Sequence, residues 1–493
     1  MRRIILIIAA LVVAPTLYGQ NIPEYRNDAV ELSAEYKQGN AFQQDLLLYA
    51  DMLSSTHPYY ADAKHRKGLE RRVRKVYKEC GKIDDVADFK LTLARLAASL
   101  GDGHTAISYW SNLERIFPVR LSLDINQPAK VDVTSEEHRA LLGKEVKAVN
   151  GRPLSKILRS AREIVSADND VNFLNLVKEY LMFAEFWSFL DMSDERLTLT
   201  FADGSSAEVE AINKRELRIA QLQRNTQERV TAMRNTLFDY TIFEEEGICY
   251  LQFNQFADRV TLPQYKQLAR FDEFVAKMMA EVEAKGVETL VVDLQYNGGG
   301  NSNLGDVLLS WLKPHAETER YGVDVRISKL LLERYPYYRD FTYDGEELKL
   351  GEVYDMWQFD HNRGQEIDYN APQDSSQHIL NFDVERIFRG DVIFVEGKES
   401  FSSATLLLTK ARDCGVGIIV GEPSGGRPSH YGDLLYCTLP NTNTIATVSH
   451  KRFVRPNREA KESDYIVPDL FIELDDPDRD LLWEWILKNY SKK

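Results

Sequence analysis

The chain has 493 residues, which is too long for one compact core and indicates two to four domains. Its composition, 44% hydrophobic and 28% charged with no low-complexity tract, excludes large-scale disorder. The formal net charge of −15, with no basic stripe evident, argues against nucleic acid or an anionic membrane surface as the main partner.

The first residues have the pattern of a secretory signal peptide. Arg2 and Arg3 form a positive start, residues 4–13 are apolar, and Gly19 is a small residue before a cleavage point. We therefore predict that residues 1–19 are removed, that the protein is exported to a periplasmic or extracellular location, and that no membrane span remains afterwards. The alternative is an uncleaved N-terminal anchor.

The four cysteines are too few for a disulfide scaffold, and their spacing matches no zinc motif. An exported compartment permits disulfides, and the sequence does not determine any pairing. We expect Cys80, Cys249, Cys414 and Cys437 to be buried apolar residues.

Residues 20–116 are predicted to form a helical N-terminal region. In "DDVADFKLTLARLAASLGDG" the apolar residues recur at helical spacing, Asp84 or Asp85 can cap the start, and Gly101 and Gly103 can end the helix. His104 follows directly, in "GDGHT".

Residues 117–210 change to short alternating segments separated by turn sequences, which predicts a β-rich domain with a helix over 155–170. Residues 211–240 are charged and helix-prone, so we predict a helical connector there.

From residue 241 onward, Val/Ile/Leu runs alternate with amphipathic helices, which indicates an α/β domain with strands buried on both faces. A final amphipathic helix is expected in 476–490. The inner face of the helix in 263–286 should consist of Phe271, Phe274, Val275, Met278, Met279 and Val282.

The segment "GKESFSSATLLL", residues 397–408, places Ser400, Ser402 and Ser403 between a buried strand and a helix. A serine at such a junction lies near unpaired helix N-terminal amides, which can stabilise an oxyanion. A strand, turn and helix in this order expose the nucleophile in several hydrolase folds. The alternative is that one of these serines only caps the helix.

Two glycine-bearing loops should lie at the same sheet edge, "DLQYNGGGNSNLG" at 293–305 and "GEPSGGRPSHYGD" at 421–433. Consecutive glycines expose backbone amides and allow close approach of a substrate. The first loop satisfies neither nucleotide-binding glycine motif, so we do not predict a nucleotide ligand.

The ordered motifs "VVDLQYNGGG", "FSSATLLLTKARDCGVGIIVGEPSGG" and "DYIVPDLFIE" resemble the tail-specific (C-terminal processing) serine peptidase family. With "HPYY" and "GDGHT" they are similar to its tricorn-core and interphotoreceptor-retinoid-binding-protein-like branch. The resemblance implies an α/β protein with a helical N-terminal region, a small PDZ-like middle domain at 117–210 and a ClpP/crotonase-like catalytic domain at 241–493. A purely structural β-domain is the alternative for the middle part.

The resemblance also implies a set of site residues. Ser402 corresponds to the nucleophile, and the amide of Ser403 with that of Gly298 or Gly299 to the oxyanion hole. The residues implied in substrate binding are Gly300, Gly425, Gly426 and Arg427.

The expected base is His104, and Glu462 corresponds to the family's acidic residue near the final Pro-Asp. Where the tail-specific branch carries a lysine base, this chain has Arg427, which stays protonated. His430, in the glycine loop at 421–433, is an alternative base, and a site without a working base is a further alternative. His57 is expected to be a structural helix end. Thr405 replaces a glutamate common in relatives.

The predicted function is that of an exported serine endopeptidase that cleaves a polypeptide substrate by acyl transfer, with neither metal nor organic cofactor. The alternative is a catalytically inactive relative that binds peptides. A carbohydrate hydrolase has no motif support, and no sequence feature indicates an oligomeric state.

Overall fold

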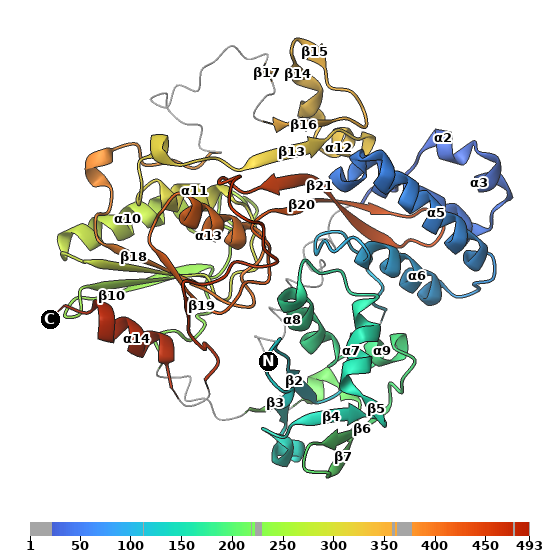
Figure 1. The fold of residues 1–493 in the computed structure, drawn as a ribbon, viewed down its shortest axis with the longest axis horizontal. Coiled ribbons are helices and arrows are strands. Elements are labelled where there is room, and N and C mark those ends of the chain that lie inside the picture. Colours follow the sequence, from blue (N-terminus) through green and yellow to red (C-terminus); the bar gives the residue numbers. More distant parts are fainter. Residues whose placement is uncertain are drawn as a thin grey trace. The chain divides into compact units, whose positions relative to one another are not determined.

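The computed structural model describes residues 22–111, 113–217, 219–221, 229–356, 360–361, 377–476 and 479–492. The predicted signal peptide, residues 1–19, lies outside them. The chain forms two compact units. Unit 1 comprises Met1–Leu222, Gly322–Arg363 and His430–Phe453, and unit 2 comprises Gln223–Tyr321, Gly364–Ser429 and Val454–Lys493. Figure 1 shows the elements of both.

Unit 1 begins with the predicted helices. Asp85 caps the helix that contains Phe89 by accepting a hydrogen bond from the N–H of Ala87, and Gly101 follows it with a φ of +65°. The apolar faces of the N-terminal helices meet in a core that includes Leu46, Tyr49 and Phe89. The helices are α2 Asp28–Glu31, α3 Ala34–Gln38, α4 Ala41–Thr56, α5 Ala63–Cys80 and α6 Val86–Ala98.

The middle part of unit 1 contains two antiparallel sheets, ordered β2-β3-β9 and β5-β4-β6-β7. In β6 buried residues alternate with more exposed ones, as predicted for a half-buried strand. The predicted helix over 155–170 is shorter, and two further helices follow it. The elements are β2 Val119–Ser122, β3 Lys130–Ser135, β4 Val146–Val149, β5 Arg152–Pro153, α7 Leu154–Arg162, α8 Asp170–Tyr180, α9 Ala184–Phe189, β6 Arg196–Phe201, β7 Ser206–Glu210 and β9 Ile219–Gln221.

The helical prediction for residues 211–240 is wrong for the part that the structure describes. β8 Ile212–Asn213 pairs with β1 Arg115–Ile116, and β9 pairs with the edge of β3. Another strand, β10 Phe238–Phe243, starts before the predicted connector ends. Pairing with distant strands outweighs the helix propensity of a charged segment.

A four-stranded sheet with the order β16-β13-β21-β20 completes unit 1. The strands of this sheet were predicted as part of the catalytic domain 241–493, but they belong to unit 1. They pair with one another and with the N-terminal region. For example, the N–H of Ser108 donates to the carbonyl of Ile445 at 2.9 Å. The remaining elements are β13 Gly322–Arg326, α12 Lys329–Arg334, β14 Phe341–Tyr343, β15 Glu346–Glu347, β16 Val353–Asp355, β17 Asp360–His361, β20 His430–Thr438 and β21 Ile445–Val454.

Unit 2 is a six-stranded sheet with the order β10-β11-β12-β18-β19-β22. β10 is antiparallel to β11, and the other neighbours are parallel. Successive residues of β12 reach opposite cores, Leu290 and Val292 on one face and Val291 on the other. The strands are β11 Ile248–Phe253, β12 Thr289–Asp293, β18 Asp391–Glu396, β19 Ile418–Gly421 and β22 Leu470–Phe471.

Helices cover both faces of this sheet, which explains its continuous apolar strands. Three helices contribute to the core on one face, α10 Phe271–Ala284, α11 Asn303–Leu309 and α13 Ser403–Asp413. The last helix, α14 Leu481–Tyr490, packs through Leu482 and Ile486 on the other face and is capped by Asp480. The predicted α/β class is therefore confirmed, and α10 buries the predicted inner face except for the partly buried Phe274.

All four cysteines are buried and form no disulfide, as expected. Among the described residues, no helix has the length and apolar character needed to cross a membrane.

Candidate active site

The turn between β18 and α13 in unit 2 holds Ser402 in an unusual conformation. Ser402 has φ +54° and ψ −121°, and its side chain makes no capping hydrogen bond to α13. Positive φ is costly for a residue with a Cβ and occurs mainly at functional sites and tight turns. Ser402 is therefore not an ordinary capping serine; it lies in a sharp strand-to-helix turn of the kind that exposes a nucleophile.

The other two serines of the turn have structural contacts. The Ser400 hydroxyl donates to the carbonyl of Leu294 at 2.8 Å and accepts from the N–H of Gly397 at 3.0 Å. The Ser403 hydroxyl donates to the carbonyl of Gly300 at 2.7 Å. The hydrogen bonds donated by the Ser400 and Ser403 hydroxyls thus join the serine turn to the glycine loop at 293–305.

Asn297 holds the same loop against the turn. It is fully buried, and its side chain donates to the carbonyl of Phe253 at 2.7 Å and accepts from the N–H of Gly299 at 2.8 Å. Its carbonyl accepts the N–H of Phe401 at 3.0 Å. Asn297 was not among the predicted site residues, although its position before three glycines suited it to this role.

Close packing explains two of the three glycines. A Cβ on Gly299 would lie 2.7 Å from the Cβ of Ser402, and one on Gly300 would lie 2.2 Å from the carbonyl oxygen of Phe256. Both have positive φ, +104° and +135°. Only glycine lets the backbone approach Ser402 and Phe256 this closely.

Two backbone amides beside Ser402 are available to a ligand. The N–H of Gly299 is engaged by Asn297, but those of Gly298 and Ser403 donate no hydrogen bond to any residue that the structure describes. A Cβ on Gly298 would meet no atom within 4 Å. Ser403 is the first residue of α13, where the helix dipole favours negative charge. The pair can therefore stabilise an anionic oxygen.

The glycine loop at 421–433 lies beside the serine turn through Gly426. The N–H of Gly426 donates to the carbonyl of Ser400 at 3.2 Å, and a Cβ there would lie 2.2 Å from the hydroxyl of Thr405. Gly425 is buried next to it. Arg427 forms an ion pair with Asp464 at 3.3 Å.

Glu462 is exposed and accepts a hydrogen bond from the hydroxyl of Ser429 at 2.6 Å. That hydroxyl accepts in turn from the N–H of Arg455 at 3.0 Å. The contacts of Glu462 in unit 2 thus order the chain around Ser429 and do not include Ser402.

In unit 1, His104 lies in a buried cluster centred on Asp102. The Asp102 carboxylate accepts from the hydroxyls of Thr105 at 2.6 Å and Ser449 at 2.7 Å, and from the backbone N–H of His104 at 2.9 Å. The Nε2 of His57 lies 3.1 Å from the same carboxylate. The ring Nδ1 of His104 is 3.6 Å from Asp102 Oδ1. Asp102 is thus a fixed carboxylate beside the predicted base.

His57 is held in one tautomer. Its Nδ1 accepts the backbone N–H of Tyr59 at 3.1 Å, so Nδ1 carries no proton and Nε2 donates to Asp102. His57 also ends α4, which matches the predicted structural role.

The charge of Asp102 controls the electrostatics of this cluster. Burial alone would raise the pKa of Asp102, but hydrogen bonds from His104 and His57 hold that pKa well below its ordinary value. Burial alone would lower the pKa of His104, and Asp102 outweighs it, so the pKa of His104 lies above its ordinary value. His104 is therefore oriented and made more basic by Asp102.

The alternative base His430 lies next to His104 in unit 1. Their rings stack with centroids 5.9 Å apart, and both residues are buried. His430 begins β20 and packs its ring on Phe453 as well.

Asp102, His104 and Asp168 offer possible cation ligands, since one such atom from each lies within 4.8 Å of the others. Asp102 already accepts several hydrogen bonds, and Asp168 accepts the N–H of Gly103 at 2.7 Å. This arrangement fits a residue that orients His104 better than a metal site. We had not predicted Asp102, although "GDGHT" places an acid two residues before the candidate base.

The structure thus brings Ser402, Ser403, the glycine loop at 293–305 and residues 421–429 of the second glycine loop together within unit 2, and it places His104 with Asp102 in unit 1. The pairing of His104 with Ser402 stays a prediction.

Comparisons with known proteins identify a family for the segment that contains the serine turn. Residues 247–472 match the model of peptidase family S41, a range that contains the serine turn and both glycine loops. No curated protein matches the sequence.

Among solved structures, mature CPAF complexed with lactacystin is 14% identical, with 92% of this chain and 98% of that chain covered and a TM-score of 0.60. A second structure of mature CPAF is also 14% identical, with 92% and 96% covered and a TM-score of 0.59. These similarities show a shared fold. The match to the family model shows that residues 247–472 of this chain belong to peptidase family S41, the tail-specific protease family.

Proposed function

We propose that the protein is an exported serine endopeptidase with Ser402 as nucleophile and His104 as base. The observation that carries the proposal is the strained backbone of Ser402 beside two available amides, Gly298 and Ser403. A polypeptide is the substrate class of the peptidase family to which residues 247–472 belong. Export rests on the signal pattern in residues 1–19.

Acyl transfer proceeds in two steps. The Ser402 Oγ attacks the carbonyl carbon of the scissile peptide bond while His104 takes its proton. The carbonyl oxygen, now negative, is held by the N–H groups of Ser403 and Gly298; removing one such donor costs about 2.7–4 kcal/mol in other enzymes. His104 then protonates the departing amine, and water releases the acyl group by the reverse sequence.

Asp102 is the orienting acid in this proposal, in place of the predicted Glu462. A buried carboxylate beside the imidazole fixes its orientation and stabilises the imidazolium that forms during attack. Glu462 instead orders the segment around Ser429 through the hydrogen bond described above.

Gly300, Gly425 and Gly426 shape the wall next to the nucleophile, and Arg427 with Asp464 adds a charged pair beyond it. We assign these residues to substrate binding. Residues 117–210 are proposed as a PDZ-like module that holds an extended peptide along a strand edge.

Two single variants test the nucleophile. Ser402→Ala should abolish hydrolysis of an unfolded protein substrate. Ser403→Ala should retain most activity, because its amide, and not its hydroxyl, acts in the oxyanion hole. Full activity of Ser402→Ala would refute the proposal. Peptide binding without turnover by the unmodified protein would instead identify an inactive peptide-binding relative.

A further inference from the structure

Helix α5 in unit 1 has a concentrated positive charge, although the whole chain has a net charge of −15. Eight of its 18 residues are Lys or Arg and two are Glu, which gives a formal charge of +6 with His65 neutral. The absence of a basic stripe, assumed from overall charge, is therefore wrong for this helix. The net charge of the whole chain did not reveal this positive helix, because acidic residues outnumber basic ones in the rest of the chain.

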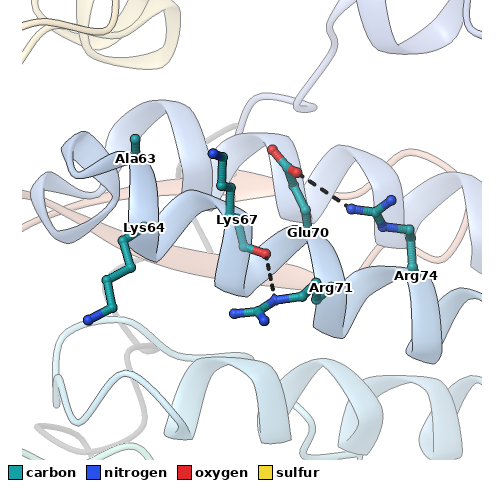
Figure 2. Close-up of a pocket in the computed structure, with 6 residues that line it drawn as sticks. All are labelled: Ala63, Lys64, Lys67, Glu70, Arg71 and Arg74. Atoms are coloured by element: carbon teal, nitrogen blue, oxygen red, sulfur yellow. Dashed lines mark hydrogen bonds and ion pairs between the residues drawn. The ribbon is translucent and has the colours of Figure 1, made fainter.

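The basic residues form one face. Lys64, Lys67, Arg71, Arg74 and Lys78 are exposed and recur every three or four residues, the spacing of neighbours along a helix surface. We call these five residues the α5 basic face. Figure 2 looks onto this face: Lys64 and Arg71 project toward one edge of the face, and Lys67 and Arg74 project toward the other edge. An open hollow of about 580 Å³ is lined by four of them, Lys64, Lys67, Arg71 and Arg74, together with Ala63 and Glu70.

Most of this charge has no internal partner. In the part of the chain that the structure describes, no ion pair involves Lys64, Lys67, Arg71 or Lys78. Arg71 donates only to the carbonyl of Lys67, at 3.4 Å, and Arg74 pairs with Glu70 at 3.7 Å. Figure 2 shows these two contacts as dashed lines. The charge is thus available to an external anion.

The chemistry of the face favours a polypeptide anion. The apolar side of α5, Leu69 and Val73, is buried, and no large hydrophobic residue of α5 is exposed, so the helix lacks the apolar face with which amphipathic helices enter a bilayer. It also presents no exposed aromatic platform for bases. The carboxylate of Glu70, midway along the face, would repel a continuous phosphate backbone, whereas the carboxylates of a peptide can be spaced around it.

We propose that the α5 basic face binds acidic segments of polypeptides and so recruits acidic substrates. The substrate role rests on the proposed peptidase activity, but the binding itself does not. The face acts by charge attraction and therefore weakens as salt is added.

Direct binding tests the face without catalysis. The full-length Ser402→Ala chain is titrated into a fluorescent Asp/Glu-rich peptide and into its Asn/Gln counterpart. Added Lys67→Glu and Arg71→Glu substitutions should weaken binding of the acidic peptide about tenfold. The matched control carries Lys277→Glu and Lys488→Glu, the same charge change on exposed positions of α10 and α14, and should bind as tightly as the parent.

Hydrolysis gives the second arm, with one cleavable sequence carrying either tail. The α5 variant should lose about tenfold in kcat/KM for the acidic tail and nothing for the neutral tail. Three results would overturn the proposal: no binding of the acidic peptide, equal losses in the Lys277/Lys488 control, or tighter binding to phosphatidylglycerol vesicles or duplex DNA than to the acidic peptide. If the unmodified chain hydrolyses neither substrate, the peptidase proposal fails while the binding arm still decides the role of α5.

Discussion

Ser402 differs from its neighbours Ser400 and Ser403 in backbone conformation rather than in chemistry. All three carry the same hydroxyl, and two of them use it to hold the glycine loop in place. The sequence pattern identified the cluster of three serines, but physical reasoning alone could not tell which of them is the nucleophile. The choice of Ser402 came from the family resemblance. The positive φ of Ser402 supplies the physical reason for that choice.

Strain at Ser402 predicts an unusual order of stabilities. Glycine tolerates φ +54° without a Cβ clash, whereas alanine keeps the strain. Ser402→Gly should therefore be more stable than Ser402→Ala by about 1 kcal/mol, even though glycine increases the entropy of the unfolded chain. Urea unfolding of the two inactive variants measures the difference. Equal stabilities, or a more stable alanine variant, would show that the conformation carries no strain.

The effect of Asp102 on His104 is a second prediction at the residue scale. The base must be neutral to act, so kcat/KM should fall on the acidic side through the raised pKa of His104. In Asp102→Asn the largest opposition to burial is removed and only the more weakly acting carboxylates of Asp168 and Asp433 remain, so the pKa of His104 drops and the acidic limb should move to lower pH. The rate at the plateau should fall about a hundredfold because orientation is lost.

Ser449→Ala serves as the control for that experiment, since it removes one hydrogen bond to Asp102 and keeps the negative charge. Its acidic limb should stay near that of the unmodified protein. An unmoved limb in Asp102→Asn would mean that Asp102 does not act on the catalytic base.

At the scale of elements, local patterns predicted what local forces determine. α6 and α10 follow from apolar periodicity and the parallel strands of unit 2 from continuous Val/Ile/Leu runs. The strands in 211–240 were missed because their partners, such as Arg115–Ile116, are remote in sequence. The Asp102 cluster was missed for the same reason, since Ser449 lies 347 residues away.

The β20–β21 hairpin contains a buried histidine that should make unit 1 sensitive to mild acid. Neither ring nitrogen of His450 has a hydrogen-bond partner among the described residues, the carboxylate of Asp433 is 3.6 Å away, and Lys451 is adjacent. Burial lowers the pKa of His450 from 6.5 to about 4. Between these values the unfolded chain binds more protons than the folded one, so the free energy of unfolding decreases as the pH falls.

The full shift corresponds to roughly 3 kcal/mol. His450→Leu cannot take up a proton, so urea unfolding at about pH 7 and about pH 4.5 should show a smaller loss of stability in this variant than in the unmodified protein. Identical losses in both proteins would contradict a buried neutral His450.

At the scale of the whole molecule, the proposed chemistry is divided between two units that are each discontinuous in sequence. In the proposal unit 2 supplies the hydroxyl and the amides, and unit 1 supplies His104, Asp102 and the α5 basic face. Consecutive domains were the natural expectation from sequence, because composition changes along the chain but says nothing of strands that return to an earlier unit. The functional proposal requires both units to act on one peptide bond.

Covalent labelling with a fluorophosphonate tests that requirement most directly, because the probe reacts only with a serine whose hydroxyl is activated by a base. Mass spectrometry of the digested protein should find the adduct on Ser402, with a labelling rate about a hundredfold lower in His104→Gln and nearly unchanged in Ser403→Ala. No adduct at Ser402, or equal labelling of His104→Gln and the unmodified protein, would contradict the account.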